Sequence, residues 1–436
     1  MFLTFLPPIL ETNQPLTGDR YVSATGNDSA DGLSRDTAWA TFTKLNTWIA
    51  SLTTGTYSAV ILAGDYTLTD GISFGNNSAV TLTLDFEEGV TVDTSSAATK
   101  EDGFDIQNAP TSYVTINLRG AQFTGNSVSS ANGIGTTNNV NLVVNGAAAD
   151  GSKATFTSYD DGASFHGTSG SASAIQINDC LFTNCTKSAF AHVNSACGTF
   201  ARCRFEGRSG ATIGIGDNQS TVPSVYTDCQ FIPAGAGQGV FFSGDTLTNC
   251  QIGTISTAAT FGNFSARGAI ATDCFINSGG DGPGIWQMTR CYGYFDFRIR
   301  GTSSVSSLFE NCVFEGRTNT TDFAAGTFDG GGGLWLGGSA VFRNTILYDF
   351  DEVFKFASTT QRDHMNANWQ VTNCALFENN TNFQSGLTLG TNLVTTNPLL
   401  GSRATESQAD WCIGSGSPCI GAGVSGANIG FALSDL

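Results

Sequence analysis

The sequence is short of basic residues. Lys and Arg number 19 among 436 residues, against 37 Asp and Glu, which gives a formal net charge of −18 at pH 7. A nucleic-acid partner needs clusters of Lys and Arg to neutralise phosphates, so we expect none. Only 13% of the residues are charged, and we therefore expect Asn, Ser and Thr to fill most of the surface.

Long apolar stretches are also lacking. No segment reaches the roughly 18 apolar residues that span a bilayer, so we expect no membrane partner. The segment Met1–Leu10 is apolar, but no Lys or Arg precedes its apolar run, Pro7 and Pro8 interrupt it, and no small-residue cleavage site follows. We expect an arm that docks on a partner or a peptide that covers the protein's own end, and not an export signal.

A short phrase recurs instead: a polar residue, Asn or Asp, Cys, a variable residue and a large apolar residue. Weaker copies surround Cys203, Cys291 and Cys374, and Arg343–Leu347 is a copy without cysteine. Successive spacings from Cys180 to Cys312 are 23, 26, 21, 24, 17 and 21 residues. A period of this size indicates a solenoid, in which each unit packs on its neighbours. The clearest copies are Asn178–Phe182, Thr227–Phe231, Thr248–Ile252, Thr272–Ile276 and Glu310–Phe314.

The repeats are rich in Val, Ile, Phe and Thr and show no helical period, which predicts an all-β fold: a single parallel β-helix solenoid. The cysteines should form an internal ladder of free thiols that pack as small apolar groups. The Asn or Asp before each cysteine should occupy a left-handed turn, which these side chains tolerate. Cys412 and Cys419 lie outside the repeats and form the best candidate disulfide.

The expected organisation has four parts. Residues 1–19 form an N-terminal arm or linker, and residues 20–57 form a capping segment with a short helix. That helix has apolar residues at Trp39, Phe42, Leu45 and Ile49, with Asp36 as its N-cap. Residues 58–400 supply coils of about 22–25 residues, about fourteen in all. Residues 401–436 form a closing segment.

Several stretches resemble the right-handed parallel β-helix proteins of pectin-lyase-like fold. This resemblance implies a right-handed winding. It also implies carbohydrate-directed functions, since the family includes polysaccharide lyases, glycosidases and bacteriophage tailspikes. The stretches that carry it are Tyr21–Ser34, Thr37–Phe42, Val60–Tyr66, Asn397–Leu400 and Gly416–Gly423.

The segment Asp281–Arg300 gathers aromatic and charged residues. Strand alternation places Tyr294, Asp296, Arg298 and Arg300 on one outward face. Asp281, Trp286 and Tyr292 are expected to flank it. Rings beside carboxylates and guanidinium groups suit a sugar chain, so we predict sugar binding by the rings and arginines, with Asp296 and Asp281 as catalytic candidates. The alternative is a surface ion-pair ladder.

The phrase F-E-G-R occurs twice and places Glu206 and Glu315 at the same turn of different coils, with Asp349 at a similar place. A column of carboxylates would provide the pair that glycoside hydrolysis requires, so Glu315 and Asp349 are catalytic candidates. The alternative is a repeated salt bridge at the turn.

The family resemblance also implies the lyase chemistry of some members, in which a Lys or Arg base acts beside Ca²⁺ held by carboxylates. The matching candidates are Asp160 and Asp161 as metal ligands, with Lys187 or Lys355 as base. Ca²⁺ is the only cofactor that this interpretation would require.

The leading expectation is a bacteriophage virion surface protein, tailspike- or fibre-like, that binds host or environmental glycans. Its other expected partners are virion proteins, docked through the N-terminal arm, and copies of itself in a homotrimer. Its location would be the virion or an extracellular surface. Two alternatives remain open: a polysaccharide lyase or glycoside hydrolase, and a non-catalytic structural spike.

Overall fold

The structure is a computed structural model of the chain. It describes residues 15–67, 71–75, 79–96, 102–127, 131–166, 174–189, 191–193, 198–208, 215–217, 223–234, 239–242, 245–254, 256, 260–261, 269–279, 286–296, 306–316, 323–324, 339–350, 352–356, 358–379 and 381–435. Contacts divide the chain into two compact units, Met1–Thr186 and Lys187–Leu436. Within the described ranges, no helix is long and apolar enough to cross a bilayer.

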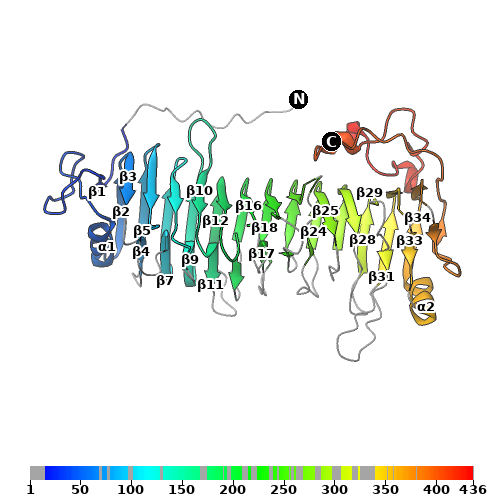
Figure 1. The fold of residues 1–436 in the computed structure, drawn as a ribbon, viewed down its shortest axis with the longest axis horizontal. Helices are drawn as coiled ribbons and strands as arrows, with labels where there is room; N and C mark the ends of the chain where they lie inside the picture. Colours follow the sequence, from blue (N-terminus) through cyan, green and yellow to red (C-terminus); the bar gives the residue numbers. More distant parts are fainter. Residues whose placement is uncertain are drawn as a thin grey trace. The chain divides into compact units, whose positions relative to one another are not determined.

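The first unit is built from parallel strands that repeat coil after coil (Figure 1). Its first strand series consists of β1 (Arg20–Val22), β2 (Gly55–Ile61), β5 (Val80–Phe86), β7 (Phe104–Asn117), β9 (Asn132–Asn145) and β12 (Ala174–Asn178), with β4 (Ile72–Phe74) and β11 (Asp161–His166) paired to β7 and β9. Its second strand series consists of β3 (Gly64–Thr67), β6 (Val90–Asp93), β8 (Gln122–Thr124), β10 (Ala154–Thr157) and β13 (Cys180–Thr183).

Strand register in the first unit stacks like residues inside the coils. Phe123, Phe156 and Phe182 are register partners in successive strands. The rings of Phe123 and Phe156 stack with centroids 5.0 Å apart, and those of Phe156 and Phe182 with centroids 5.3 Å apart. All three are fully buried. Because each coil repeats the position of the last, one apolar residue per coil produces a continuous core.

Helix α1 (Phe42–Ser51) packs near β4 and buries Phe42, Leu45 and Ile49, as predicted. Its N-cap is Thr41, whose hydroxyl accepts the Lys44 N–H at 3.2 Å. The predicted cap at Asp36 is therefore wrong, because the helix starts later. Asp28 accepts the Thr41 N–H at 3.0 Å and so supports the helix start from the preceding loop.

The second unit repeats the same plan with further parallel strands. Its first series consists of β15 (Gly198–Ala201), β18 (Val225–Thr227), β21 (Thr246–Thr248), β24 (Ala269–Thr272), β26 (Trp286–Thr289), β28 (Ser306–Glu310), β31 (Ser339–Arg343), β34 (Trp369–Thr372) and β37 (Gly390–Thr391). Its second series consists of β16 (Arg204–Glu206), β19 (Gln230–Ile232), β22 (Gln251–Ile252), β25 (Phe275–Gly279), β27 (Tyr292–Asp296), β29 (Val313–Glu315), β32 (Ile346–Tyr348) and β35 (Ala375–Phe377).

Shorter elements complete the second unit. Helix α2 (Thr359–Asn368) contacts β31 and β34 and was not predicted. Three short helical turns lie near the end of the chain, namely η1 (Gln408–Trp411), η2 (Val424–Gly426) and η3 (Leu433–Asp435). The remaining strands are β14 (Ala191–Val193), β17 (Ile215–Asp217), β20 (Gly239–Phe241), β23 (Thr260–Phe261), β30 (Phe323–Ala324), β33 (Glu352–Lys355) and β36 (Thr381–Phe383).

The predicted thiol ladder is confirmed. In the described residues, eleven cysteines are free and buried. The thiols link successive coils by donating to backbone carbonyls of the preceding coil. For example, the Cys250 S–H donates to the Tyr226 carbonyl at 3.5 Å. Thr345 takes the same place where the cysteine is missing, and its hydroxyl donates to the Phe309 carbonyl at 3.1 Å. The candidate pair Cys412 and Cys419 is not bridged, because both thiols are free.

The predicted left-handed turns are also confirmed. In the second unit, the residue before each ladder position has a φ between 51° and 57°, and its N–H bonds to the next coil. A side chain in this region costs roughly 1–2 kcal/mol, which Asn and Asp offset by local hydrogen bonds. These corner residues are Arg202, Asp228, Asn249, Asp273, Arg290, Asn311, Asn344 and Asn373.

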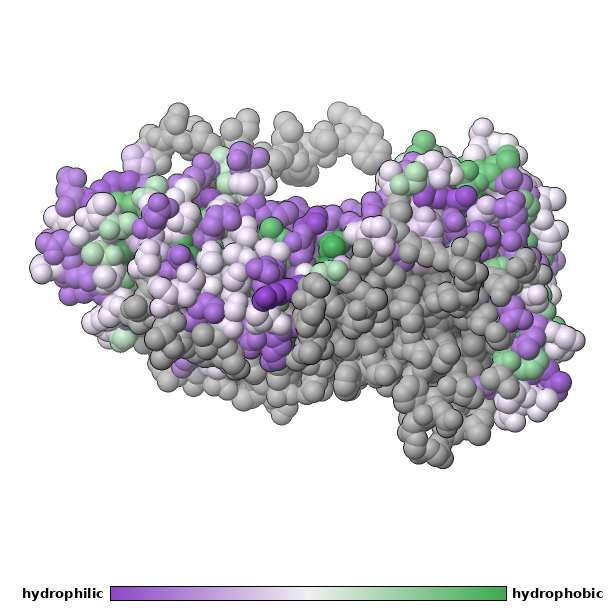
Figure 2. All heavy atoms as spheres, viewed as in Figure 1, coloured by the Kyte–Doolittle hydropathy of each residue, from purple (hydrophilic) through white to green (hydrophobic). Residues whose placement is uncertain are grey.

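The coils are less regular than predicted. The register step is 17 residues between Phe275 and Tyr292 but 33 between Val313 and Ile346. The second series has five described strands in the first unit and eight in the second. The step length varies because insertions lie in the loops and leave the paired strands unchanged. On the face shown in Figure 2, described side chains are mainly hydrophilic or weakly polar, which agrees with the composition.

The chain after the last coils, here named the C-terminal segment (residues 400–435), runs back along the side of the second unit. Bridges join Leu400 to Ile413 and Ile413 to Ala432, so the segment forms a small layer of its own. Its Gly430 N–H donates to the Asn344 carbonyl at 2.6 Å. The segment therefore covers strands of the second series from outside.

Candidate functional site

The first residue of each second-series strand in the second unit points outward, and together these residues form the outward column. The residue before each is the buried ladder residue and the residue after is also buried. Register pairs place the column members on top of one another, coil by coil. In order, the column is Arg204, Gln230, Gln251, Phe275, Tyr292, Val313, Ile346 and Ala375.

The polar end of this column is held by a chain of hydrogen bonds. The Arg204 guanidinium donates to Gln230 Oε1 at 3.0 Å, and the Gln230 amide donates to Gln251 Oε1 at 3.0 Å. The Gln251 amide in turn donates to the Gly253 carbonyl at 2.9 Å. Each amide is fixed by its neighbours, so its remaining donor and acceptor positions are oriented before any ligand arrives.

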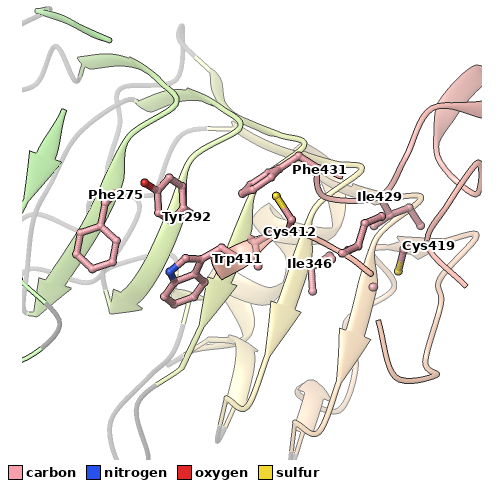
Figure 3. Close-up of a cluster of buried hydrophobic side chains, with 11 residues drawn as sticks. Phe275, Tyr292, Ile346, Trp411, Cys412, Cys419, Ile429 and Phe431 are labelled. Atoms are coloured by element: carbon pink, nitrogen blue, oxygen red, sulfur yellow. The ribbon is translucent and has the colours of Figure 1, made fainter. Parts of the chain in front are cut away.

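The apolar end of the column lies under the C-terminal segment. The rings of Phe275 and Tyr292 approach Trp411, with centroids 6.3 and 5.9 Å away (Figure 3). Val313, Ile346 and Ala375 join the same buried cluster. The column is apolar where the segment covers it and polar where the amide chain runs.

Hydrogen bonds fix the edge of the C-terminal segment. The Tyr292 hydroxyl donates to the Glu406 carbonyl at 2.8 Å, and the Gln408 amide donates to Asp273 Oδ1 at 3.1 Å. Both carboxylate oxygens of Asp273 also accept from one edge of the Arg290 guanidinium, at 2.7 and 2.5 Å. This pairing raises the pKa of Arg290 above its usual value.

A cavity of about 240 Å³ lies where the column changes from amides to rings. Glu406 contributes from the C-terminal segment, and Phe275 adds a second ring beside Tyr292. The Asn249 amide donates to Asp228 Oδ1 at 2.6 Å and joins two corners of the wall. This arrangement can offer amide and carboxylate groups beside aromatic edges. The other lining residues that matter here are Asp228, Gln230, Asn249, Gln251 and Tyr292.

The predicted face around Asp296 is only partly described. The backbones of Trp286 and Asp296 lie in β26 and β27. Asp281, Arg298 and Arg300 lie outside the described residues, so their predicted roles stay predictions.

The expected exposure of the two tyrosines needs correction. Tyr292 is 4% exposed, and burial raises its pKa. Tyr294 is partly buried, and its hydroxyl donates to the Arg403 carbonyl at 3.4 Å. Both rings pack against the C-terminal segment, and Tyr292 is the one that also lines the cavity.

The predicted carboxylate column is not a catalytic pair in the case of Glu206 and Glu315. Four strands of the second series, β19, β22, β25 and β27, separate them. Five steps of about 4.8 Å correspond to about 24 Å, well beyond the roughly 5–10 Å of glycosidase carboxylates.

Glu315 and Asp349 are closer in the fold, although Asp349 is not the register equivalent of Glu315. Glu315 pairs with Tyr348, one residue earlier. The Arg403 guanidinium lies 3.2 Å from Glu315 Oε2 and its centre is 4.2 Å from the Tyr348 ring centroid. Burial and the charge of Glu378 raise the pKa of Asp349, while the charge of Arg403 opposes this. The two carboxyl groups therefore have different environments.

The role of Asp160 and Asp161 as calcium ligands stays a prediction. Asp161 is 4% exposed, and Asp160 accepts the Thr186 hydroxyl at 2.9 Å. Across the described residues, no three His, Cys, Asp or Glu side chains form a group that could hold a metal.

Apart from Tyr292, the residues of the cavity were missed at the sequence level, yet a signal was present. The variable residue after each ladder position is R, Q, Q, F, Y, V, I and A in order. This change from polar to apolar within one repeat position indicates a covered surface next to an open one. Glu406 has no such signal, because it lies outside the repeats.

No known protein family matches this chain, and no curated protein matches it. Among solved structures, pectate lyase Pel9A aligns with a TM-score of 0.35 and 14% identity over 94% of this chain and 95% of its own. ORF18 of Geobacillus virus E2 aligns with a TM-score of 0.34 and 11% identity over 86% and 60%. A rhamnogalacturonan lyase aligns with a TM-score of 0.29 and 13% identity over 81% and 87%. The stacked parallel strands themselves define the class of this protein as a parallel β-helix.

Proposed function

We propose that this β-helix protein binds carbohydrate at the cavity between the amide chain and the C-terminal segment. The observation that carries the proposal is the change of the outward column from Gln230 and Gln251 to Phe275 and Tyr292 at that point. Sugars combine hydroxyl groups, which suit amides and carboxylates, with C–H faces, which pack on aromatic rings. At the cavity, the amides meet the edges of two rings whose exposed fractions are only 1% and 4%.

The size of the site limits what it encloses. Drug-sized ligands occupy pockets of about 300–1,000 Å³, and the cavity has about 240 Å³. It therefore suits about one sugar unit, while further units would extend along the amides toward Arg204. A chain that lies along the coils matches the direction in which the column runs.

The test is binding to a panel of neutral and charged oligosaccharides by calorimetry. The double substitution Gln230→Ala and Gln251→Ala removes two polar partners, each worth about 1 kcal/mol, so we expect binding to weaken at least about tenfold. Gln122→Ala is the matched control, because Gln122 is an exposed second-series residue of the first unit. Unchanged binding by the double variant would contradict this site.

Hydrolysis of a sugar chain at Glu315 and Asp349, away from the cavity, is a second candidate function, and the different environments of these two carboxyl groups favour it. Arg403 stabilises the charged form of Glu315, whereas the pKa of Asp349 is raised. A carboxyl group with a raised pKa can serve as the acid beside an ion-paired carboxylate. The appearance of reducing ends, lost in Asp349→Asn, would support hydrolysis, whereas unsaturated ends would indicate a lyase. Binding without cleavage would leave a carbohydrate-binding protein.

We also propose that this binding takes place on a bacteriophage virion surface, with the chain acting as a tailspike- or fibre-like protein. Two features support this location: the free thiols of the ladder, and the apolar N-terminal arm, whose residues 1–14 lie outside the described residues. Deletion of residues 1–12 should release the protein from its particle, and continued assembly would reject the docking arm. Native mass spectrometry would test the proposed homotrimer. A non-catalytic structural spike would assemble without binding any glycan.

A further inference from the structure

The amide chain of the outward column ends in the wall of the cavity. This end bears on which sugars bind there, an inference that rests on the proposed carbohydrate binding. The Gln230 amide donates to Gln251 Oε1 at 3.0 Å, and the Gln251 amide donates to the Gly253 carbonyl at 2.9 Å. The next register position in the column is Phe275, which carries no amide. The chain of side-chain amides therefore stops at Gln251, which lines the cavity.

The hydrogen-bonding capacity of this wall is only partly used. A side-chain amide has two N–H donors and an oxygen with two lone pairs. Gln251 uses one donor for Gly253 and one lone pair for Gln230, so one N–H is left without a partner in the described part of the chain. Asn249 uses one donor for Asp228 Oδ1 at 2.6 Å, and its own oxygen accepts no hydrogen bond from the described residues. Asn249 and Gln251 lie two residues apart in one coil, and both line the cavity.

Only narrow strips of the two rings reach the cavity. Phe275 is 1% exposed and Tyr292 is 4% exposed, because Trp411 packs on both. A sugar ring that stacks face to face on an aromatic side chain needs an exposed ring face, which neither residue provides. A single methyl group needs much less apolar surface, so a methyl group is the apolar part of a ligand that this cavity fits best.

We propose that the cavity takes the acetamido group of an N-acetylated sugar, with Gln251 and Asn249 as specificity-determining residues. In a planar trans amide the carbonyl and the N–H point in opposite directions, so one acetamido group can bond to two partners at once. Its carbonyl accepts the remaining Gln251 N–H, its N–H donates to the Asn249 oxygen, and its methyl group packs on the ring edges. A hydroxyl group in its place brings no methyl group and leaves the ring edges without contact.

Charged residues near the cavity do not decide this selection. Arg202 lies at the corner next to that of Asp228, and Glu406 contributes to the cavity wall from the C-terminal segment. At the polar end of the column, Arg204 pairs with Glu206 at 2.5 Å. An acetamido group is uncharged, and so is the hydroxyl group with which it is compared. These charges therefore act on both ligands alike.

The experiment compares pairs of neutral oligomers of equal length by calorimetry: glucose with N-acetylglucosamine, and galactose with N-acetylgalactosamine. In at least one pair, we expect the N-acetylated oligomer to bind at least about tenfold more tightly, because it gains two hydrogen bonds and buries a methyl group. Saturation-transfer NMR of that oligomer should show the acetyl methyl protons as the ligand protons in closest contact with the protein.

Two variants test the proposed residues. Gln251→Met keeps the length of the side chain but removes its donors, and it should reduce the preference for the N-acetylated oligomer about fivefold. Asn249→Gly removes the acceptor and suits the left-handed corner, where φ is 51°, and it should reduce the preference by a similar factor. The matched controls are Gln122→Met, which removes an amide bonded to a backbone carbonyl in the first unit, and Asn311→Gly, at a corner that does not line the cavity. Both should leave the preference unchanged.

The outcomes separate this selection from the proposed function. Binding of none of the oligomers would overturn the proposed carbohydrate function and the selection with it. Equal binding within both pairs would overturn the acetamido site alone and leave carbohydrate binding in place. A preference that persists unchanged in both Gln251→Met and Asn249→Gly would mean that the acetamido group binds elsewhere, and would overturn its assignment to this cavity. A preference that falls in these two variants and not in the controls is the expected result.

Discussion

The second strand series has different outward surfaces in the two units. In the first unit, the equivalent positions are exposed or half-buried. In the second unit, the positions from Phe275 onward are buried beneath the C-terminal segment. The polarity of this one outward residue in each coil therefore indicates whether another layer covers that coil. The first-unit positions are Asp65, Thr91, Gln122, Thr155 and Leu181.

The interiors differ as well. In the first unit the ladder position holds Ala121 and Ala154 before the one thiol at this position, Cys180, whereas the second unit has a thiol at every ladder position except Thr345. The corner before this position is glycine at Gly89 and Gly120, with φ of 82° and 78°, where the second unit has mostly Asn or Asp. The left-handed corner conformation is thus adopted by glycine in the first unit and mostly by Asn or Asp in the second. Substitutions at the ladder and corner positions can test these differences between the units.

The largest expected effect is alkaline destabilisation of the thiol ladder. Burial raises the pKa of Cys274 and Cys291 well above 9.0 and that of Cys374 to about 12. Below pH about 9 the thiols are protonated in both states. Above it, unfolded thiols ionise while buried ones do not, so the free energy of unfolding should fall by about 1.4 kcal/mol per pH unit for each thiol. Urea unfolding between pH 8 and pH 10.5 would measure this slope.

Two variants sharpen the alkaline test. Cys274→Ala gives the second unit an alanine, as in the first, and should reduce the slope by one thiol. Ala154→Cys places a thiol in the ladder of the first unit and should increase it by one. A slope that is the same in both variants and the parent would show that other groups cause the alkaline effect.

The next largest effect concerns the cover of the outward column. Trp411→Ala removes a fully buried ring, a change that typically costs about 3–5 kcal/mol. We expect the C-terminal segment to detach more often, with faster hydrogen exchange in β25 and β27. Leu433→Ala is the control, because Leu433 is 65% exposed. If Trp411→Ala leaves exchange in β25 and β27 slow, the apolar column does not depend on this cover.

The smallest effect concerns the corners. Asn311 has a φ of 54°, and Gly89 has a φ of 82°. A β-carbon added at Gly89 would meet no atom within 4 Å, so a substitution there tests the backbone conformation alone. Asn311→Ala and Gly89→Ala should each cost about 1–2 kcal/mol, since alanine has no local hydrogen bond to offset the left-handed conformation. Asn311→Gly and Gly89→Asn should be nearly neutral. Thermal unfolding of the four variants would measure this, and equal losses in all four would show that the corner conformation is not the cause.

Much of the fold could be predicted because its determinants repeat. The spacing of the cysteines indicated the stacked coils, and the Asn or Asp before each indicated the left-handed corners. Helix α1 was found from its apolar period, but its start was misplaced because Asp28, distant in sequence, supports the Thr41 cap. Helix α2 was missed because only Gln361 and Met365 are buried, which leaves no apolar period.

The candidate site was harder to predict because it joins distant parts of the chain. Tyr292 and Glu406 are 114 residues apart, and Asp273 and Gln408 are 135 residues apart. No local pattern encodes such contacts. The rings of Tyr292 and Tyr294, predicted to contact sugar, both pack against Trp411 of the C-terminal segment, and their role in sugar binding stays a prediction.

The route of the C-terminal segment also orders events during protein synthesis. The coils that contain Phe275 and Tyr292 leave the ribosome more than a hundred residues before Trp411 does. At a translation rate of about 5–20 residues per second, the two rings are synthesised roughly 5–25 seconds before Trp411, which covers them. The nascent protein therefore exposes an apolar stripe for that interval, and the wall of the cavity is complete only when translation has passed Glu406.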